Sequence, residues 1–382
     1  MSCVLDEEQG MDDDYDEPEA QASNSSPHSV VSQSFRDAMA CHLYMLFSVM
    51  FFMESEAKIG SGLSSGRREN TPEAQETVAV RSSCAQAMLG AAQSMSKNRN
   101  KMWKRGVADE AVVLLPCRIA YQMLESATGI LARKAASADA ALGMIAATVD
   151  SGGTILGTIV AALMDLMHSF EHMALLCAEL CCMVSEERGN PLALELIRET
   201  GRLDTSGHSD AGKASGIKHV SPFITELAIR RPRLVLSNIS HLLPHLSSEP
   251  YCLRSAIVAA LGHIVEYIGT TLKPTEGQTI QDMEMTMIQQ DGTSSRLNLE
   301  KSREALLDIL EARSHDVSSY TRSAVLKAWI SLTQGGSFPV ERTIPVTFLA
   351  IDRLQDKTVM VRKQAMQVRA YYPLVWSCEA MF

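Results

Sequence analysis

The stretch GHSDAGKAS (207–215) places two glycines and Lys213 at a spacing close to that of a phosphate-binding loop. Such a loop needs a buried strand before it, a helix after it, and a Ser or Thr directly after the lysine to hold Mg²⁺. Here Ala214 follows the lysine, and the preceding segment LALELIRETG (192–201) has the apolar spacing of a helix. We therefore interpret 207–215 as a loop between helices that binds no nucleotide.

A second group of residues has side chains of the kind that bind metals. It consists of His168, His172, Cys177, Cys181 and Cys182. Each pair four residues apart shares one face of a helix, whereas zinc ligands usually come as closer pairs across a turn. The segment is therefore predicted to be packed core helix, and no metal or other cofactor is expected. No nucleophile is flanked by the glycines of a nucleophile elbow, so no enzymatic activity is predicted.

The stretch KNRNKMWKR (97–105) combines five cations with Trp103 and contains no acid. The cations are Lys97, Arg99, Lys101, Lys104 and Arg105. One interpretation is a solvated loop between helices, because charge runs are usually surface. The other is a contact with the phosphates of DNA, since lysines and arginines bind DNA by displacing its counterions. The sequence leaves both interpretations open.

The N-terminal region differs in composition from the rest of the chain. Residues 1–35 hold nine acids and no Lys or Arg, so of the net charge of −10 only −1 belongs to the remainder. This tail and the segment 60–76 are predicted to be disordered, with a short apolar helix at 36–57 between them. Ser26 and Thr71 each precede a proline in these segments and are candidate sites for a proline-directed kinase. The apolar run 41–53 is shorter than the roughly 20 residues that span a membrane.

A repeat organises the second half of the chain. RSAIVAALGHI begins at Arg254 and RSAVLKAWISL at Arg322, and both carry apolar residues at the same offsets. Leu261 and Trp329 occupy equivalent positions on these two predicted helices. A third copy, VRKQAMQ, has its Arg362 40 residues after Arg322. Each copy follows another amphipathic stretch, at 231–246, 302–314 and 341–354, which predicts antiparallel helix pairs.

Acidic residues stand at a fixed distance before two of the repeat arginines. Asp316 and Asp356 each precede their arginine by six residues. A carboxylate in that position can bind the free N–H groups at the start of the second helix, and the arginine can reach the turn of a neighbouring repeat. Arg254, Asp316, Arg322, Asp356 and Arg362 are thus expected to fix the register of the repeats.

Helix pairs of about 40 residues that need a neighbour to bury their apolar faces are typical of HEAT repeats. The predicted fold is an all-α HEAT-repeat α-solenoid with a disordered acidic N-terminal tail. We expect residues 1–77 to form the tail with its short helix and 78–371 the solenoid, with a polar insertion at 270–299. Residues 372–382 are expected to form an irregular C-terminal tail.

Five segments, in order, resemble the D-type, non-SMC HEAT subunits of condensin. They are HSFEHM (168–173), LALELIRETG (192–201), the run 215–265, HDVSSYTRSAVLKAWISL (315–332) and DKTVMVRKQAMQ (356–367). The resemblance implies a non-catalytic scaffold in mitotic chromosome condensation. It implies as partners a kleisin subunit, a pair of SMC ATPases and a second HEAT subunit, with chromatin or DNA bound directly or through the complex. It also implies a nuclear location, on chromosomes in mitosis, and allows the cytoplasm in interphase.

The repeat pattern alone also fits solenoids of another class. An importin-like array, or an adaptor or phosphatase scaffold, would show the same helix pairs. Only the ordered family segments favour the condensin interpretation over this alternative. Neither interpretation places the protein in a membrane.

Overall fold

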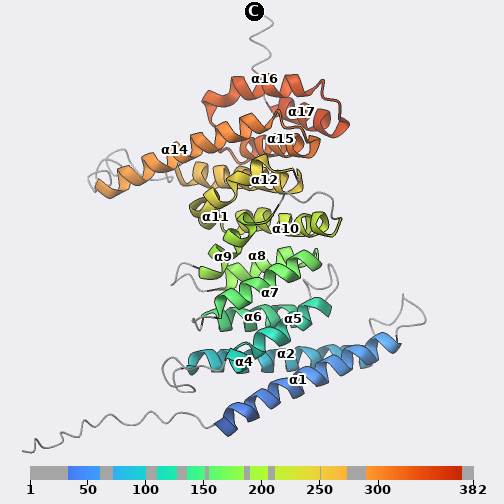
Figure 1. Cartoon of the computed structure of the whole chain (residues 1–382). Helices are drawn as coiled ribbons and strands as arrows, with labels where there is room; N and C mark the ends of the chain where they lie inside the picture. Colours follow the sequence, from blue (N-terminus) through green and yellow to red (C-terminus); the bar gives the residue numbers. More distant parts are fainter. Residues whose placement is uncertain are drawn as a thin grey trace, which may run out of the picture.

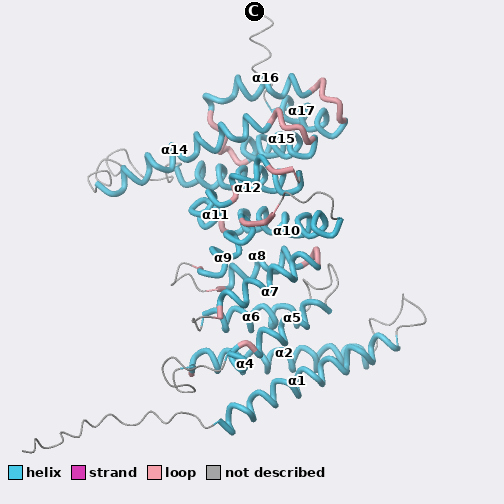
Figure 2. The backbone as a smooth tube through the Cα atoms, in the orientation of Figure 1, coloured by secondary structure: helices cyan, strands magenta, loops and turns pink. Residues whose placement is uncertain are grey.

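The computed structural model of the chain describes residues 33–60, 72–99, 110–126, 136–150, 155–184, 190–204, 211–249, 251–272 and 290–371. Within these ranges the regular structure is helical throughout, and no strand is present (Figure 2). The all-α prediction is therefore confirmed.

The α-helices are α1 (Gln33–Gly60), α2 (Pro72–Lys97), α4 (Glu110–Val113), α5 (Leu115–Ser126), α6 (Ala136–Asp150), α7 (Leu156–Ser169), α8 (Met173–Met183), α9 (Pro191–Gly201), α10 (Ala211–Arg230), α11 (Pro232–Asn238), α12 (Tyr251–Leu272), α14 (Gln290–Arg313), α15 (Ser319–Gln334), α16 (Thr343–Arg353) and α17 (Val359–Tyr371). Short 3-10 helices are η3 (Ile239–His241), η4 (Leu243–Ser247) and η5 (Val340–Arg342). The helices stack in chain order, with α1 at one end of the molecule and α16 and α17 at the other (Figure 1). The structure is an α-solenoid, as predicted.

The second half of the stack is built from the predicted repeats. Helices α12, α15 and α17 carry the three copies of the motif, and each packs against the next. Leu261 and Trp329 are both completely buried at their equivalent positions, which confirms the predicted register. Gly262 lets α12 and α15 approach closely, because a methyl group at this position would lie 2.8 Å from the Cβ of Ala328.

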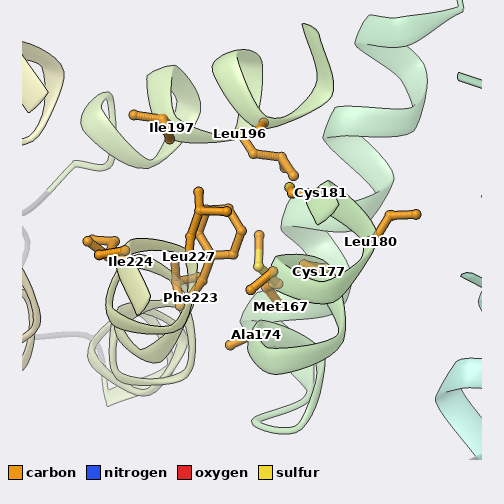
Figure 3. Packing of buried hydrophobic residues seen from close by; sticks show 14 of the residues in the cluster. Met167, Ala174, Cys177, Leu180, Cys181, Leu196, Ile197, Phe223, Ile224 and Leu227 are labelled. Atoms are coloured by element: carbon orange, nitrogen blue, oxygen red, sulfur yellow. The ribbon is translucent and has the colours of Figure 1, made fainter. Parts of the chain in front are cut away.

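The apolar core continues through the middle of the stack. Buried residues of α7, α8, α9 and α10 converge there, with Phe223 and Leu227 facing Cys177 and Met167 (Figure 3). Burial raises the pKa of the Cys177 thiol to about 12, so this thiol is neutral and serves as an apolar packing group. The segment is packed core helix, as predicted.

Helix α12 is 22 residues long and apolar enough to cross a membrane by length and composition. In the stack it packs against α10, α11, α14 and α15, and most of its apolar side chains are buried among them. A helix covered on several sides by other helices is expected to be apolar around most of its surface. The composition of α12 therefore reflects its place in the core.

The predicted boundaries near the N-terminus are corrected by the structure. The apolar helix expected at 36–57 is longer, since α1 extends from Gln33 to Gly60. Helix α2 begins at Pro72, inside the segment 60–76 that was expected to be disordered, and the expected boundary at 77 falls within it. Proline is well tolerated at the first helical position, where its missing N–H is not needed. Residues 1–32 lie outside the described residues.

The helix predicted at 231–246 is also different in the structure. Helix α11 ends at Asn238, and two 3-10 helices follow it. Pro244 cannot donate a backbone hydrogen bond, which breaks a continuous helix here. Val235 and Leu242 are almost completely buried, while Leu236 and Leu243 are only half-buried.

The polar insertion expected at 270–299 has narrower bounds. Helix α12 continues to Leu272 and α14 begins at Gln290, so helical residues occupy both ends of the predicted insertion. Arg296 of α14 donates a hydrogen bond from Nη2 to the carbonyl oxygen of Leu272 over 3.1 Å. Residues 273–289, and the tail 372–382, lie outside the described residues.

Candidate functional site

The repeat arginines bind the turns that precede their own helices. Arg322 donates from Nη1 to the carbonyl oxygens of Asp316 and Val317, over 2.7 and 3.0 Å. Arg362 does the same with Asp356 and Lys357, over 2.8 and 3.1 Å. Arg254 likewise donates to the carbonyl oxygens six and five residues before it, those of Ser248 and Glu249. Each guanidinium therefore holds the turn that enters its helix.

The same arginines also reach the aspartate of the following repeat. Arg254 donates from Nη2 to Oδ1 of Asp316 over 3.2 Å. Arg322 binds Asp356 with two bonds, Nε to Oδ2 over 2.7 Å and Nη2 to Oδ1 over 2.9 Å. The two aspartate side chains are only 4% and 3% exposed, which shields these ion pairs from solvent. We call the five residues Arg254, Asp316, Arg322, Asp356 and Arg362 the ladder.

The carboxylates of the ladder also organise the helix starts. Asp316 accepts the backbone N–H of Ser318, and Asp356 accepts both the N–H and the hydroxyl of Thr358. Ser318 and Thr358 directly precede α15 and α17, so these bonds lie just before the first helical turn rather than within it. The guanidinium of Arg322 lowers the pKa of Asp356 well below its usual range, and the bonds from Thr358 add to this effect.

Each of the two aspartates also has a second arginine nearby, which the sequence analysis did not predict. Arg313 lies 3.7 Å from Asp316 and Arg353 lies 4.0 Å from Asp356, each three residues before its partner. Arg313 also donates to the carbonyl oxygen of Leu246 in the preceding repeat over 3.0 Å. The recurring spacing of an arginine three residues before the aspartate was the available sequence signal.

The ladder ends differently at α17. Within the described ranges no carboxylate pairs with Arg362, whose bonds go to the turn before its own helix. The ladder contains no nucleophile, and the carboxylate of Asp356 is held in its charged form by Arg322, so the geometry supports a structural role: the ladder joins successive helix pairs in a fixed register.

A groove runs along the same three helices beside the ladder. It has a volume of about 430 Å³ between α12, α15 and α17, and small residues such as Ala259, Gly262 and Ala324 line it. The side chain of Lys327 also lines the groove and is exposed. At one rim the rings of Tyr251 and Tyr320 stack with centroids 4.8 Å apart, and both are about half exposed. Exposed aromatic side chains beside a groove are typical of protein-binding surfaces.

The structure describes only part of the basic stretch. Lys97 is exposed in the last turn of α2, and Arg99 follows it and is half-buried. Arg99 lines a small hollow together with Met95 and Val113. Lys101, Lys104 and Arg105 lie outside the described residues, as do both candidate phosphorylation sites, Ser26 and Thr71.

The remaining sequence candidates have structural places. His172 has its Nε2 3.1 Å from the carbonyl oxygen of Leu124, and His168 packs its ring against Gly216 of α10. No group of three potential metal ligands converges within the described ranges. Helix α10 begins at Ala211, so the loop expected over 207–215 is shorter than predicted and Lys213 lies in the first turn of a helix.

Comparison with known proteins adds an independent observation. No family model matches the chain. Condensin complex subunit 1 of Xenopus laevis is 27% identical over 343 residues, which are 88% of this chain and 23% of the relative. The chain is homologous to condensin complex subunit 1.

Other relatives of the same kind support this result. Condensin-1 complex subunit CAP-D2 of Arabidopsis thaliana is 29% identical over 278 residues, 72% of this chain and 18% of the relative. Condensin complex subunit 1 of Homo sapiens is 29% identical over 272 residues, 71% of this chain and 18% of the relative. The chain thus spans about a fifth of the length of the curated condensin subunits it matches.

Proposed function

We propose that this chain is a non-catalytic HEAT-repeat scaffold in a condensin-type complex and acts in mitotic chromosome condensation. The observation that carries the proposal is the likeness to condensin complex subunit 1 over most of the chain, in relatives from animals and plants. A solenoid whose repeats are joined by shielded ion pairs is a stiff support on which other subunits assemble. Its expected location is the nucleus, on chromosomes in mitosis, with the cytoplasm as a second location in interphase.

The partners of this scaffold are a kleisin, a pair of SMC ATPases and a second HEAT subunit, and chromatin reached directly or through the complex. We propose the groove between α12, α15 and α17 as the surface for an extended segment of the kleisin. Its small lining residues leave room for a backbone, and Lys327 at its edge favours an acidic residue in the bound segment. Lys327→Glu would reverse that charge. Lys363→Glu, at an exposed position of α17, is the matched control.

Affinity purification of the full chain from mitotic cells tests this function. An SMC ATPase and a kleisin should be recovered with the wild-type chain and with Lys363→Glu, and less kleisin with Lys327→Glu. Recovery of a Ran-type GTPase or a vesicle coat protein, with no SMC ATPase, would instead favour an importin-like or adaptor solenoid. Equal kleisin recovery with both variants would reject the groove while keeping the scaffold function.

Regulation by phosphorylation is a further part of the proposal. Ser26 and Thr71 each stand before a proline, and Thr71 directly precedes α2. A phosphate close to the start of a helix interacts favourably with its free N–H groups, and Arg67 and Arg68 are near in sequence. Phosphosite mapping on the complex from mitotic cells should find both positions modified; two unmodified positions in an intact complex would reject this regulation.

A further inference from the structure

Helix α16 carries apolar residues on a face that the other described helices leave open. Ile344 is 59% exposed and Phe348 is 50% exposed. Ile351, one turn further on, is half-buried. Residues at these spacings of four and three lie on one face of a helix. We call Ile344, Phe348 and Ile351 the α16 patch.

The repeat register shows which residues occupy the equivalent face in the preceding repeat. Asp316 and Asp356 are 40 residues apart, as are Arg322 and Arg362. The same interval takes Glu304, Asp308 and Glu311 of α14 to the three residues of the α16 patch. The α16 patch is therefore the counterpart of an acidic face on α14.

The acidic face of α14 is occupied by the chain that leaves α15. Arg342 of η5 binds Glu304, Asp308 and Glu311 over 2.8, 2.7 and 3.0 Å. These contacts raise the pKa of the guanidinium and hold it in its charged form. The segment 335–342 therefore turns back after α15 and places one side chain on this face of the preceding helix.

The residue 40 positions after Arg342 is Phe382. The segment 372–382 is thus the counterpart of 332–342, the end of α15 with its return to α14. From one repeat to the next, the last residue of the segment changes from charged to apolar, and so do the three residues of the helix face. The 40-residue interval thus matches a cation and three acids in one repeat with an aromatic residue and three apolar residues in the next.

The composition of the segment fits this position. Residues 372–382 include Leu374, Val375, Trp376, Met381 and Phe382, and contain no basic residue. The segment begins directly after Tyr371, where α17 ends, and its 11 residues exceed the eight residues (335–342) that lead from the end of α15 to Arg342, so it is long enough to reach the equivalent face. Contact between these apolar side chains and the exposed apolar face would remove both from water, which is favourable.

We propose that residues 372–382 lie back over α16 and that Phe382 packs onto the α16 patch. The segment covers the patch in the way that 335–342 covers the acidic face of α14. The proposed occupant of this face is therefore the segment 372–382 of the same chain.

Photo-crosslinking from position 382 tests the proposal. The full chain carrying benzoylphenylalanine in place of Phe382 is irradiated as a monomer, and the linked peptides are identified by mass spectrometry. Crosslinks within one chain to residues 343–353 are expected. The yield should fall about tenfold in the double variant Ile344→Ser/Phe348→Ser, which removes most of the apolar contact. Val317→Ser, at a 96% exposed position in another turn, is the matched control and should leave the yield unchanged.

Three results would overturn the proposal. Crosslinks to α16 of a second molecule, in a species of twice the mass, would make the patch an interface between copies. Crosslinks that avoid 343–353, or a yield unaffected by Ile344→Ser/Phe348→Ser, would mean that the C-terminus lies elsewhere.

A charge exchange provides an independent measurement. Phe382→Arg alone should expose the segment to chymotrypsin, which cleaves after Trp376. Combining it with Ile344→Glu, Phe348→Asp and Ile351→Glu recreates the contact between Arg342 and α14, and should restore the protection. Equal cleavage rates in both variants would contradict the proposed packing.

Discussion

Arg322 binds both carboxylate oxygens of Asp356, a residue 34 positions further along the chain, through Nε and Nη2 at 2.7 and 2.9 Å. The same guanidinium uses Nη1 to hold the turn at Asp316 and Val317. One side chain thus fixes the start of its own helix and the start of the helix in the next repeat. This double contact makes Arg322 the most connected arginine of the ladder.

Breaking the Arg322–Asp356 pair should destabilise the solenoid. Arg322→Ala leaves a carboxylate that is 3% exposed without its main partner, which typically costs about 3–5 kcal/mol. The free energy of unfolding in urea measures the loss. Arg202→Ala, which removes an exposed pair with Glu199, should cost at most about 1 kcal/mol and serves as control. Similar losses in the two variants would contradict a special role of the ladder.

The stability of the fold should depend on pH through Asp356. Its pKa in the folded chain lies below the ordinary value because Arg322 donates two hydrogen bonds to the carboxylate. The stabilisation is therefore fully present above the ordinary pKa, near 4, and is lost as the pH falls toward the folded pKa. Urea midpoints of wild type and Asp356→Asn, measured from pH 7 to pH 3, should converge as the pH decreases. A constant difference across this range would show that the carboxylate charge is not the stabilising feature.

Trp329 is a core residue of the repeat and should be sensitive to truncation. It is completely buried and packs edge-on against Phe338, with ring centroids 5.6 Å apart. Trp329→Ala is expected to cost about 3–5 kcal/mol, because the contacts of a large side chain are lost and a cavity remains. Chemical denaturation measures this loss, and Val340→Ala, at an 81% exposed position, should have almost no effect. A small loss for Trp329→Ala would reject the assigned register.

A pair of hydroxyl groups links α12 to α15, and the equivalent pair between α15 and α17 lacks one hydroxyl. Ser255 and Thr321 bring their hydroxyl oxygens to 3.2 Å, but the equivalent positions of the next helix pair hold Ser323 and the apolar Val361. The buried Oγ of Ser323 has no hydrogen-bond partner among the described residues. Val361→Thr should therefore raise the stability by about 1 kcal/mol.

The gain from Val361→Thr should depend on Ser323. In a Ser323→Ala background the new hydroxyl has no such partner, and Val361→Thr should lower the thermal midpoint instead of raising it. A double-mutant cycle from thermal unfolding measures the coupling. An equal effect in both backgrounds would mean that the two side chains do not meet.

The basic stretch 97–105 offers a test of direct DNA binding. Replacing Lys101, Lys104 and Arg105 by Glu should weaken binding to unrelated DNA sequences equally, because phosphates carry no base information. The dependence of affinity on salt should also become shallower, since fewer counterions are released. Binding measured by fluorescence anisotropy at several salt concentrations decides the matter. Unchanged affinity and salt dependence would identify the stretch as a solvated loop.

The sequence by itself determined the helical class and the repeat. Apolar spacing on the segments from Arg254 and Arg322 fixed one buried face on each helix, and the structure buries Leu261 and Trp329 accordingly. This worked because an amphipathic helix must cover its apolar face, whichever neighbour provides the cover. Local signals were less informative where short-range effects compete, as at Pro244, where the predicted helix breaks into 3-10 turns.

Only the tertiary structure decided which residues of different repeats meet. Arg322 and Asp356 are 34 residues apart, and no local pattern states which aspartate each arginine reaches. The same holds for Arg342, which gathers Glu304, Asp308 and Glu311 from a helix one repeat earlier. Such contacts depend on the angle and distance between neighbouring helix pairs. These are set by side-chain packing at positions like Gly262, which brings α12 and α15 together, and packing geometry cannot be read from spacing along the chain.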